Sequence, residues 1–193
     1  MKQLVALDIC SGFGGATKAA EDRGWKVIKV DIEPRVKPTI VGDVFHFPLR
    51  PFPVDLFWAS PTCTEYSRYD QKGLFPSEPP PDQSLYHACR ALIEEWQPRC
   101  WVIENVRGAA RWWGQPDYRF GSRLLWTNIP MMGSPDLSNV GVKRNMSWGQ
   151  DPLRTAKRGY IPYVISEVVI SAVEALLPMG GDGGRLTAIW LAH

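Results

Sequence analysis

The sequence has few of the residues that build metal sites and disulfide frameworks. Among its 193 residues are four cysteines and three histidines. The cysteines stand at positions 10, 63, 89 and 100, show no C-x-x-C spacing, and have no histidines clustered beside them. We therefore expect no structural zinc and no other bound metal. Because free thiols persist in a reducing compartment, we expect a cytoplasmic protein.

Long apolar runs and a large charge of one sign are also missing. The sequence shows neither a membrane span nor a cleavable leader, so we expect no membrane association. The net charge of +2 gives no argument for nucleic acid by itself, and any basic surface must be local. The content of 45% hydrophobic and 22% charged residues is typical of one globular domain with a substantial core.

Strand-like and helix-like segments alternate along the chain. Short apolar runs predict strands at residues 4–9, 26–30, 40–41, 54–59, 100–103 and 123–127, and helical periodicity predicts helices at residues 14–22, 84–96 and 164–177. This alternation predicts an α/β fold, with a mostly parallel sheet and helices on both faces. The proline-rich residues 73–84 form either a lid or a stiff connector.

The first motif, "DICSGFGG" at residues 8–15, places a glycine-rich turn between a strand and a helix. Such a turn lets the backbone come close to a ligand. Asp31 ends the next strand, where an acidic residue can accept hydrogen bonds from a ribose, and Asp43 follows the third strand, placed to accept from an adenine amino group. The glycines do not fit the G-x-G-x-x-G pattern of dinucleotide sites, so together these residues suggest S-adenosylmethionine.

Two further motifs follow predicted strands. "SPTCTEYS" at residues 60–67 puts Cys63 on the turn that leaves a buried strand, where a thiol of lowered pKa would be a nucleophile. We interpret Cys89 and Cys100 as small buried residues and Cys10 as part of the glycine turn. "WVIENV" at residues 101–106 delivers Glu104 to the same edge. Partial burial would keep its carboxyl protonated as a general acid, and a surface salt bridge is the alternative.

These motifs, in this order, resemble those of the DNA (cytosine-5) methyltransferases. "DICSGFGG" resembles the family's cofactor motif, "SPTCTEYS" its Pro-Cys catalytic loop, and "ENV" its glutamate motif. "GYIPYVISEVVISAV", at residues 159–173, is similar to the family's last motif. The resemblance implies a Rossmann-like methyltransferase fold, with one catalytic domain at 1–178, a reduced target-recognition insert at 133–157 and a flexible tail at 179–193.

The resemblance also implies a chemistry. Cys63 would add to C6 of cytosine, Glu104 would act at N3, Arg123 would lie near O2, and C5 would take the methyl group from S-adenosylmethionine. A base in duplex DNA would flip out of the stack. The residues implied to bind the cofactor are Asp8, Ser11, Gly12, Phe13, Gly14, Asp31, Ile32, Asp43, Val44, Ser60 and Ser166. Those implied to contact nucleic acid are Ser67, Arg68, Arg107, Lys143, Arg144 and Trp148.

The sequence departs from the family at three places. Thr62 replaces the proline before the catalytic cysteine, Arg119 stands where the arginine motif has glutamine, and the insert is short. We therefore expect a short recognition site, weak sequence preference, or a specificity partner or homodimer. So small a chain would suit a phage or mobile element. The tryptophans at residues 112–113 either contact nucleic acid or cover the edge of the core.

Three other functions remain open at this stage. One is a methyltransferase that acts on single-stranded DNA or on free cytosine nucleotides, which the short insert favours. Another is a degenerate nucleic-acid-binding or regulatory subunit that keeps the fold without the activity. The third, a dinucleotide oxidoreductase, is disfavoured because its glycine pattern is missing.

Overall fold

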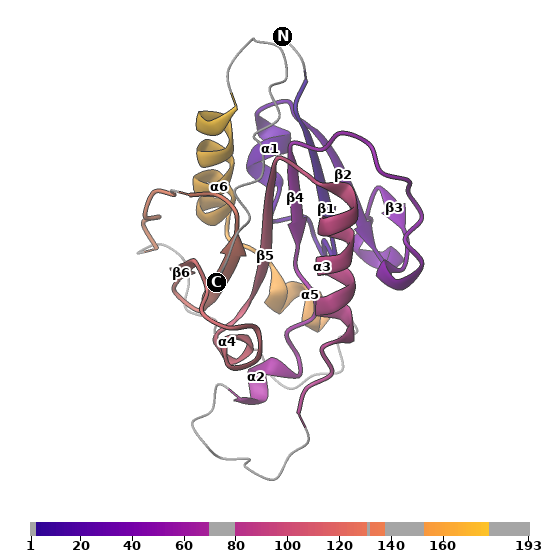
Figure 1. Ribbon diagram of the computed structural model, residues 1–193, viewed down its shortest axis with the longest axis vertical. Helices are drawn as coiled ribbons and strands as arrows, with labels where there is room; N and C mark the ends of the chain where they lie inside the picture. The colour runs from indigo at the N-terminus through magenta and orange to yellow at the C-terminus, as the bar shows by residue number, and fades with distance from the viewer. Residues whose placement is uncertain (1–2, 70–79, 131, 138–152, 178–193) are drawn as a thin grey trace.

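The computed structural model describes residues 3–69, 80–130, 132–137 and 153–177, and its core is a seven-stranded sheet (Figure 1). The strand order is β3-β2-β1-β4-β5-β7-β6. The strands are β1 (Val5–Ile9), β2 (Lys26–Asp31), β3 (Ile40–Val41), β4 (Leu56–Ala59), β5 (Cys100–Val106), β6 (Tyr118–Phe120) and β7 (Arg123–Thr127).

Neighbouring strands from β3 to β5 run parallel, whereas β7 runs antiparallel between β5 and β6. The strand order reverses between β1 and β4, and ligands of such sheets bind outside the carboxyl ends at this point. Order and directions together are those of a Rossmann-like α/β fold with a mostly parallel sheet. The predicted fold class is thus confirmed.

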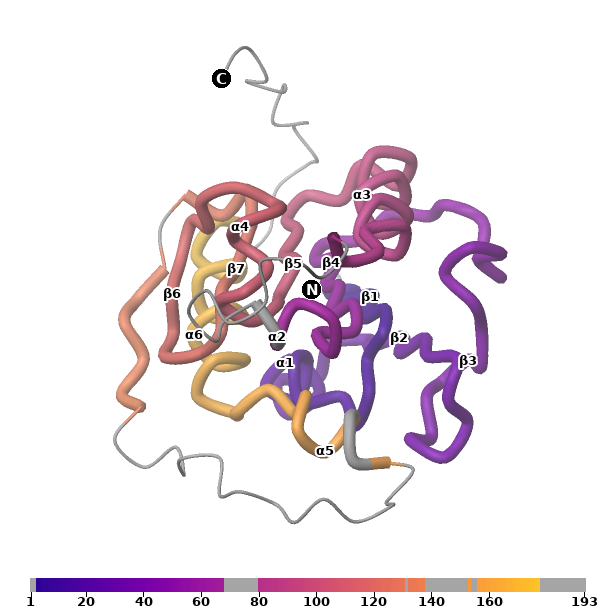
Figure 2. The backbone as a smooth tube through the Cα atoms, turned by 90° about the horizontal axis from the view of Figure 1, so that it is seen from below, coloured from indigo at the N-terminus to yellow at the C-terminus, as the bar shows by residue number. Residues whose placement is uncertain are grey.

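Helices cover both faces of the sheet. In Figure 2, α3 (Ser84–Trp96) lies on one side of the row of strands, and α1 (Lys18–Asp22) and α5 (Arg154–Gly159) lie on the other. Next to α1 packs α6 (Tyr163–Leu176). The buried side chains of α3 recur at the spacing of one helical face and meet the sheet: Cys89, Leu92, Ile93 and Trp96.

Several short elements complete the fold. They are the helices α2 (Tyr66–Tyr69) and α4 (Ala110–Trp113) and the 3-10 turns η1 (Pro34–Val36), η2 (Val44–His46) and η3 (Arg107–Ala109). Three of them, α2, η3 and α4, gather below the carboxyl ends of the central strands in Figure 1. Among the described residues, no helix is both long and apolar enough to cross a membrane.

The structure differs from the sequence prediction in the bounds of one helix and one strand, and it contains four elements that the sequence did not predict. The first helix begins at Lys18 instead of residue 14, because residues 10–14 form a turn with positive φ at Cys10, Gly12 and Gly14. The strand predicted at 100–103 continues to Val106, because β7 pairs with its second half. The sequence did not predict β6, α2, α4 or α5. Most of the proline-rich stretch and of the insert, and the whole tail, lie outside the described residues.

Candidate active site

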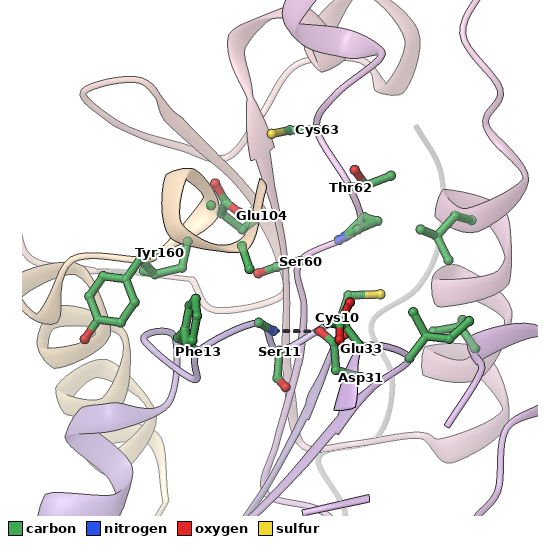
Figure 3. A pocket seen from close by; sticks show the side chains of 18 of the residues that line it. Cys10, Ser11, Phe13, Asp31, Glu33, Ser60, Thr62, Cys63, Glu104 and Tyr160 are labelled. Atoms are coloured by element: carbon green, nitrogen blue, oxygen red, sulfur yellow. Dashed lines mark hydrogen bonds between the residues drawn. The ribbon is translucent and has the colours of Figure 1, made fainter. Parts of the chain in front are cut away.

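A cavity of about 430 Å³ lies at the carboxyl ends of β1, β2, β4 and β5 (Figure 3). In Figure 3, Cys63 lies near the top and Asp31 and Glu33 at the lower end, with Ser60 and Glu104 between them. Most of the residues singled out from the sequence line this one space: Ser11, Gly12, Phe13, Asp31, Ile32, Asp43, Val44, Ser60, Cys63, Glu104 and Arg123.

The glycine turn forms the wall of the cavity next to α1. Gly12 has a φ of 50°, and its N–H donates to Asp31 Oδ2 at 2.8 Å. A Cβ on Gly15 would lie 2.4 Å from the carbonyl oxygen of Ile161. This glycine therefore lets the segment before α6 approach, a role that the sequence did not indicate. Ser11 is buried, and its hydroxyl has no hydrogen-bond partner among the described residues.

Two carboxylates stand at the ends of neighbouring strands. Besides Gly12, Asp31 also accepts from the backbone N–H of Glu33, at 2.9 Å. Asp43 accepts from the N–H of Phe45 at 3.0 Å. Glu33 and Phe45 also line the cavity but were missed from the sequence, although each lies two residues beyond a predicted site residue.

The loop that carries Cys63 is held from two sides. The Asn105 amide donates to the carbonyl oxygen of Pro61 at 3.0 Å, in a buried hydrogen bond. The carbonyl oxygen of Cys63 accepts from the backbone N–H and the hydroxyl of Ser67, at 2.9 and 2.8 Å. These bonds hold the loop although the residue before Cys63 is a threonine and not a proline.

Glu104 and Arg123 form a buried ion pair on adjacent strands. Arg123 Nη1 donates to Glu104 Oε1 at 2.9 Å, and the two residues are 5% and 3% exposed. The sequence placed Glu104 at a strand end, but it lies within β5 because β7 pairs alongside. Its carboxyl is therefore paired with the Arg123 cation. The sequence analysis expected burial to keep this carboxyl protonated and did not predict the buried ion pair. Arg119, on β6, is exposed and does not line the cavity.

Three expected cofactor residues, Asp8, Gly14 and Ser166, do not line the cavity but support it from behind. Asp8 is fully buried and accepts from the Thr17 hydroxyl at 2.8 Å, and burial raises the pKa of its carboxyl to about 7. Gly14 donates its N–H to the carbonyl oxygen of Ser11. Ser166 accepts from the N–H of Ala19 at 3.1 Å, so it joins α6 to α1. A direct ligand contact by these three is not supported.

Of the residues expected to contact nucleic acid, three lie within the part of the chain that the structure describes. Ser67 and Arg107 are exposed outside the cavity, in α2 and η3, which pack against each other. The backbone of Arg68 lies in α2. Lys143, Arg144 and Trp148 fall outside the described residues. Trp113 stacks on Tyr86 with ring centroids 4.1 Å apart, which favours the interpretation that it covers the edge of the core.

The cavity holds a thiol, an ion pair and hydrogen-bonding backbone in one space. All four cysteines are free. Within the described part of the chain, no three His, Cys, Asp or Glu side chains gather as a metal site would require. The arrangement can therefore combine a nucleophile with charged groups that stabilise a reacting ring, beside a site suited to a nucleoside.

No protein-family model matches the chain, and no curated protein sequence matches it. Solved structures resemble it distantly. A candidate DNA modification methyltransferase from an E. coli prophage is 23% identical, with a TM-score of 0.39, over 55% of this chain and 33% of that one. A Pyrococcus horikoshii protein is 16% identical, with a TM-score of 0.38, over 61% and 57% of the two chains. A glycopeptide N-methyltransferase complexed with S-adenosylmethionine is 16% identical, with a TM-score of 0.38, over 69% and 61%.

In each of these comparisons the chain covers less than two thirds of the matched structure's length. At this level of similarity no family is shown. What the chain binds and what reaction it catalyses are therefore argued from its own cavity.

Proposed function

We propose that the protein is a methyltransferase that transfers a methyl group from S-adenosylmethionine to C5 of cytosine in DNA. One observation carries this proposal: Cys63, Glu104 and Arg123 line the same cavity as the glycine turn and the carboxylates Asp31 and Asp43. A nucleophile, an ion pair and a nucleoside site in one space are what cytosine-5 methylation requires.

The residues at one end of the cavity fit the adenosine part of the cofactor. Ile32, Val44 and Phe45 offer apolar surface, and Ile32 and Phe45 are 68% and 54% exposed there. Asp31 and Asp43 provide carboxylate acceptors at strand ends. The Ser11 hydroxyl, for which the described residues provide no partner, can bond to a polar group of the ligand. When bound, the cofactor supplies an electrophilic methyl group.

Cys63 is the proposed nucleophile because C5 of cytosine is too weak a nucleophile by itself. Its thiolate sulfur adds to C6, and the displaced electron pair makes C5 nucleophilic enough to take the methyl group. Loss of the C5 proton to a base and departure of the thiolate then restore the aromatic ring. The hydrogen bonds of Asn105 and Ser67 hold the loop, so the sulfur is positioned before the base arrives.

Glu104 and Arg123 stabilise the ring during addition. As a carboxylate, Glu104 accepts a hydrogen bond from the cytosine amino group, and after taking up a proton it donates to N3. Arg123 supplies positive charge beside the polarised O2. Both groups are buried, and an electrostatic contact is stronger there than in water.

Covalent trapping tests the proposal. The protein is incubated with S-adenosylmethionine and duplex DNA containing 5-fluorocytosine, in which fluorine cannot leave as a proton does, and is resolved on a denaturing gel. We expect a shifted band that Cys63→Ser abolishes and Cys100→Ala, which removes a buried thiol remote from the cavity, retains. No adduct on any cytosine substrate, from protein shown to bind both ligands, would contradict catalysis and favour a binding subunit.

The same assay separates the substrate alternatives. Single-stranded DNA and the free nucleotide, each carrying 5-fluorocytosine, are run beside the duplex. If single-stranded DNA or the free nucleotide forms the adduct and the duplex does not, the same chemistry acts on a different substrate. That result would overturn duplex DNA as the target.

A further inference from the structure

The Arg123 guanidinium joins two parts of the molecule that are far apart in the sequence. Besides the bond to Glu104, its Nη2 donates to the carbonyl oxygens of Arg158 and Tyr160, at 3.1 and 3.0 Å. These acceptors lie at the end of α5, 35 and 37 positions after Arg123 in the sequence. One buried side chain on the sheet therefore holds the segment that leads into α6.

This segment closes the cofactor half of the cavity. Ala156, Gly159, Tyr160 and Ile161 all line the cavity. In Figure 3 the side chains of Tyr160 and Phe13 lie close together on the same side of the site, the first from this segment and the second from the glycine turn. The carbonyl of Ile161 also fills the space that a side chain on Gly15 would need. The segment thus forms a wall facing the proposed S-adenosylmethionine site.

The guanidinium has enough donors for both the wall and a substrate. It carries five N–H groups in a rigid plane. Among the described residues, the three hydrogen bonds above use three of these five groups, so two can donate to a base. A lysine could not span this set, because its ammonium is a single point charge on a flexible stem.

We propose that Arg123 is a positioning residue for the cofactor, in addition to its contact with cytosine. By holding the Arg158 and Tyr160 carbonyls, it keeps the 153–161 wall in place, so cofactor affinity depends on Arg123 even when no nucleic acid is present. This inference rests on the proposed function. If Arg123 only contacted the cytosine base, cofactor affinity in the absence of nucleic acid would not depend on it.

Isothermal titration with S-adenosylhomocysteine, without DNA, tests the inference. We expect Arg123→Ala to weaken binding about tenfold or more, which corresponds to about 1.4 kcal/mol. Arg119→Ala, an exposed arginine on the neighbouring strand, is expected to bind as the wild type does. Millimolar guanidinium chloride, against matched sodium chloride, is expected to restore part of the affinity of Arg123→Ala, a rescue that general loosening of the fold would not give.

A second pair of variants covers the case in which Arg123→Ala does not fold because Glu104 is left buried without its cation. Glu104→Gln replaces the carboxylate with an amide whose oxygen can still accept the bond from Nη1, and it keeps Arg123 and its bonds to the wall. Glu104→Gln combined with Arg123→Met removes the wall contacts and leaves no unpaired charge. We expect only the double variant to lose affinity for S-adenosylhomocysteine, with thermal unfolding recorded for both.

The outcomes separate this inference from the proposed function. Equal affinity of the wild type and the Arg123 variants would overturn the positioning role and leave the proposed function standing. A wild-type protein that does not bind S-adenosylhomocysteine would overturn both.

Discussion

Gly15 is the residue at which the glycine turn and the wall before α6 come closest. A Cβ there would lie 2.4 Å from the Ile161 carbonyl oxygen, closer than such atoms can approach. We therefore expect Gly15→Ala to lower the free energy of unfolding by about 1 to 3 kcal/mol and to weaken cofactor binding. Thermal unfolding and titration with S-adenosylhomocysteine measure the two effects. Gly133→Ala, where a Cβ meets nothing within 4 Å, is the control, and equal losses in both variants would contradict this reason.

Asp8 makes stability depend on pH, because its carboxyl is fully buried behind the glycine turn. Burial raises its pKa from 3.8 to about 7 in the folded protein. Between these values the unfolded chain loses the proton and the folded chain keeps it, so the stabilisation is complete below pH 3.8 and is lost as pH rises to about 7. A shift of this size corresponds to about 4 kcal/mol.

We expect Asp8→Asn to remove this dependence, because an amide has the shape of the protonated acid and does not titrate. Urea unfolding between pH 4 and pH 7.5 measures it. The variant should gain stability over the wild type as pH rises through this window. A difference that stays constant with pH would contradict the buried, protonated carboxyl.

At the scale of elements, Asn105 joins β5 to the loop that leaves β4. Its side-chain Nδ2 donates to the Pro61 carbonyl, and its side-chain Oδ1 accepts from the N–H of Val106 at 2.8 Å. We expect Asn105→Ala to leave two buried backbone groups without partners, at about 1 to 3 kcal/mol each, and to slow adduct formation by Cys63.

Quench-flow trapping on 5-fluorocytosine DNA measures that rate at saturating cofactor, where a change in binding does not enter. Thr64→Ala is the matched control, because this side chain of the same loop is exposed, does not line the cavity, and contacts the Thr62 hydroxyl. An adduct rate in Asn105→Ala equal to that of the wild type would show that Asn105 does not position the nucleophile.

The parts of the fold that local sequence determines were predictable, and the long-range contacts were not. Apolar periodicity identified α3 and β7 with the observed bounds, and the motif residues Cys63, Glu104 and Asp31 meet at one cavity because parallel strands end at one edge. β6 is three residues long and α5 is polar, so neither has a clear pattern.

The wall of the cavity shows most clearly which contacts could not be predicted from the sequence. The role of Gly15 depends on Ile161, and the contacts of Arg123 depend on backbone carbonyls, which every residue has. No residue type or spacing marks these partners. A sequence motif can therefore indicate the chemical groups of the site but not the contacts that hold its walls in place.

At the scale of the whole molecule, charge limits how the proposed enzyme would bind DNA. The net charge is only +2, so we expect few phosphate contacts and a shallow fall of DNA affinity with salt concentration.

Among the described residues, Arg107 is our candidate for one of these phosphate contacts. It is exposed on η3, which packs against the helix that follows Cys63. We expect Arg107→Ala to weaken duplex binding similarly for all sequences and to reduce the slope of log K against log salt by about 1. Fluorescence anisotropy at several salt concentrations measures the slope, with Arg50→Ala, exposed on the loop before β4, as the control. If Arg107→Ala keeps the wild-type slope, the DNA backbone does not pass over η3, and the phosphate contacts must come from another face.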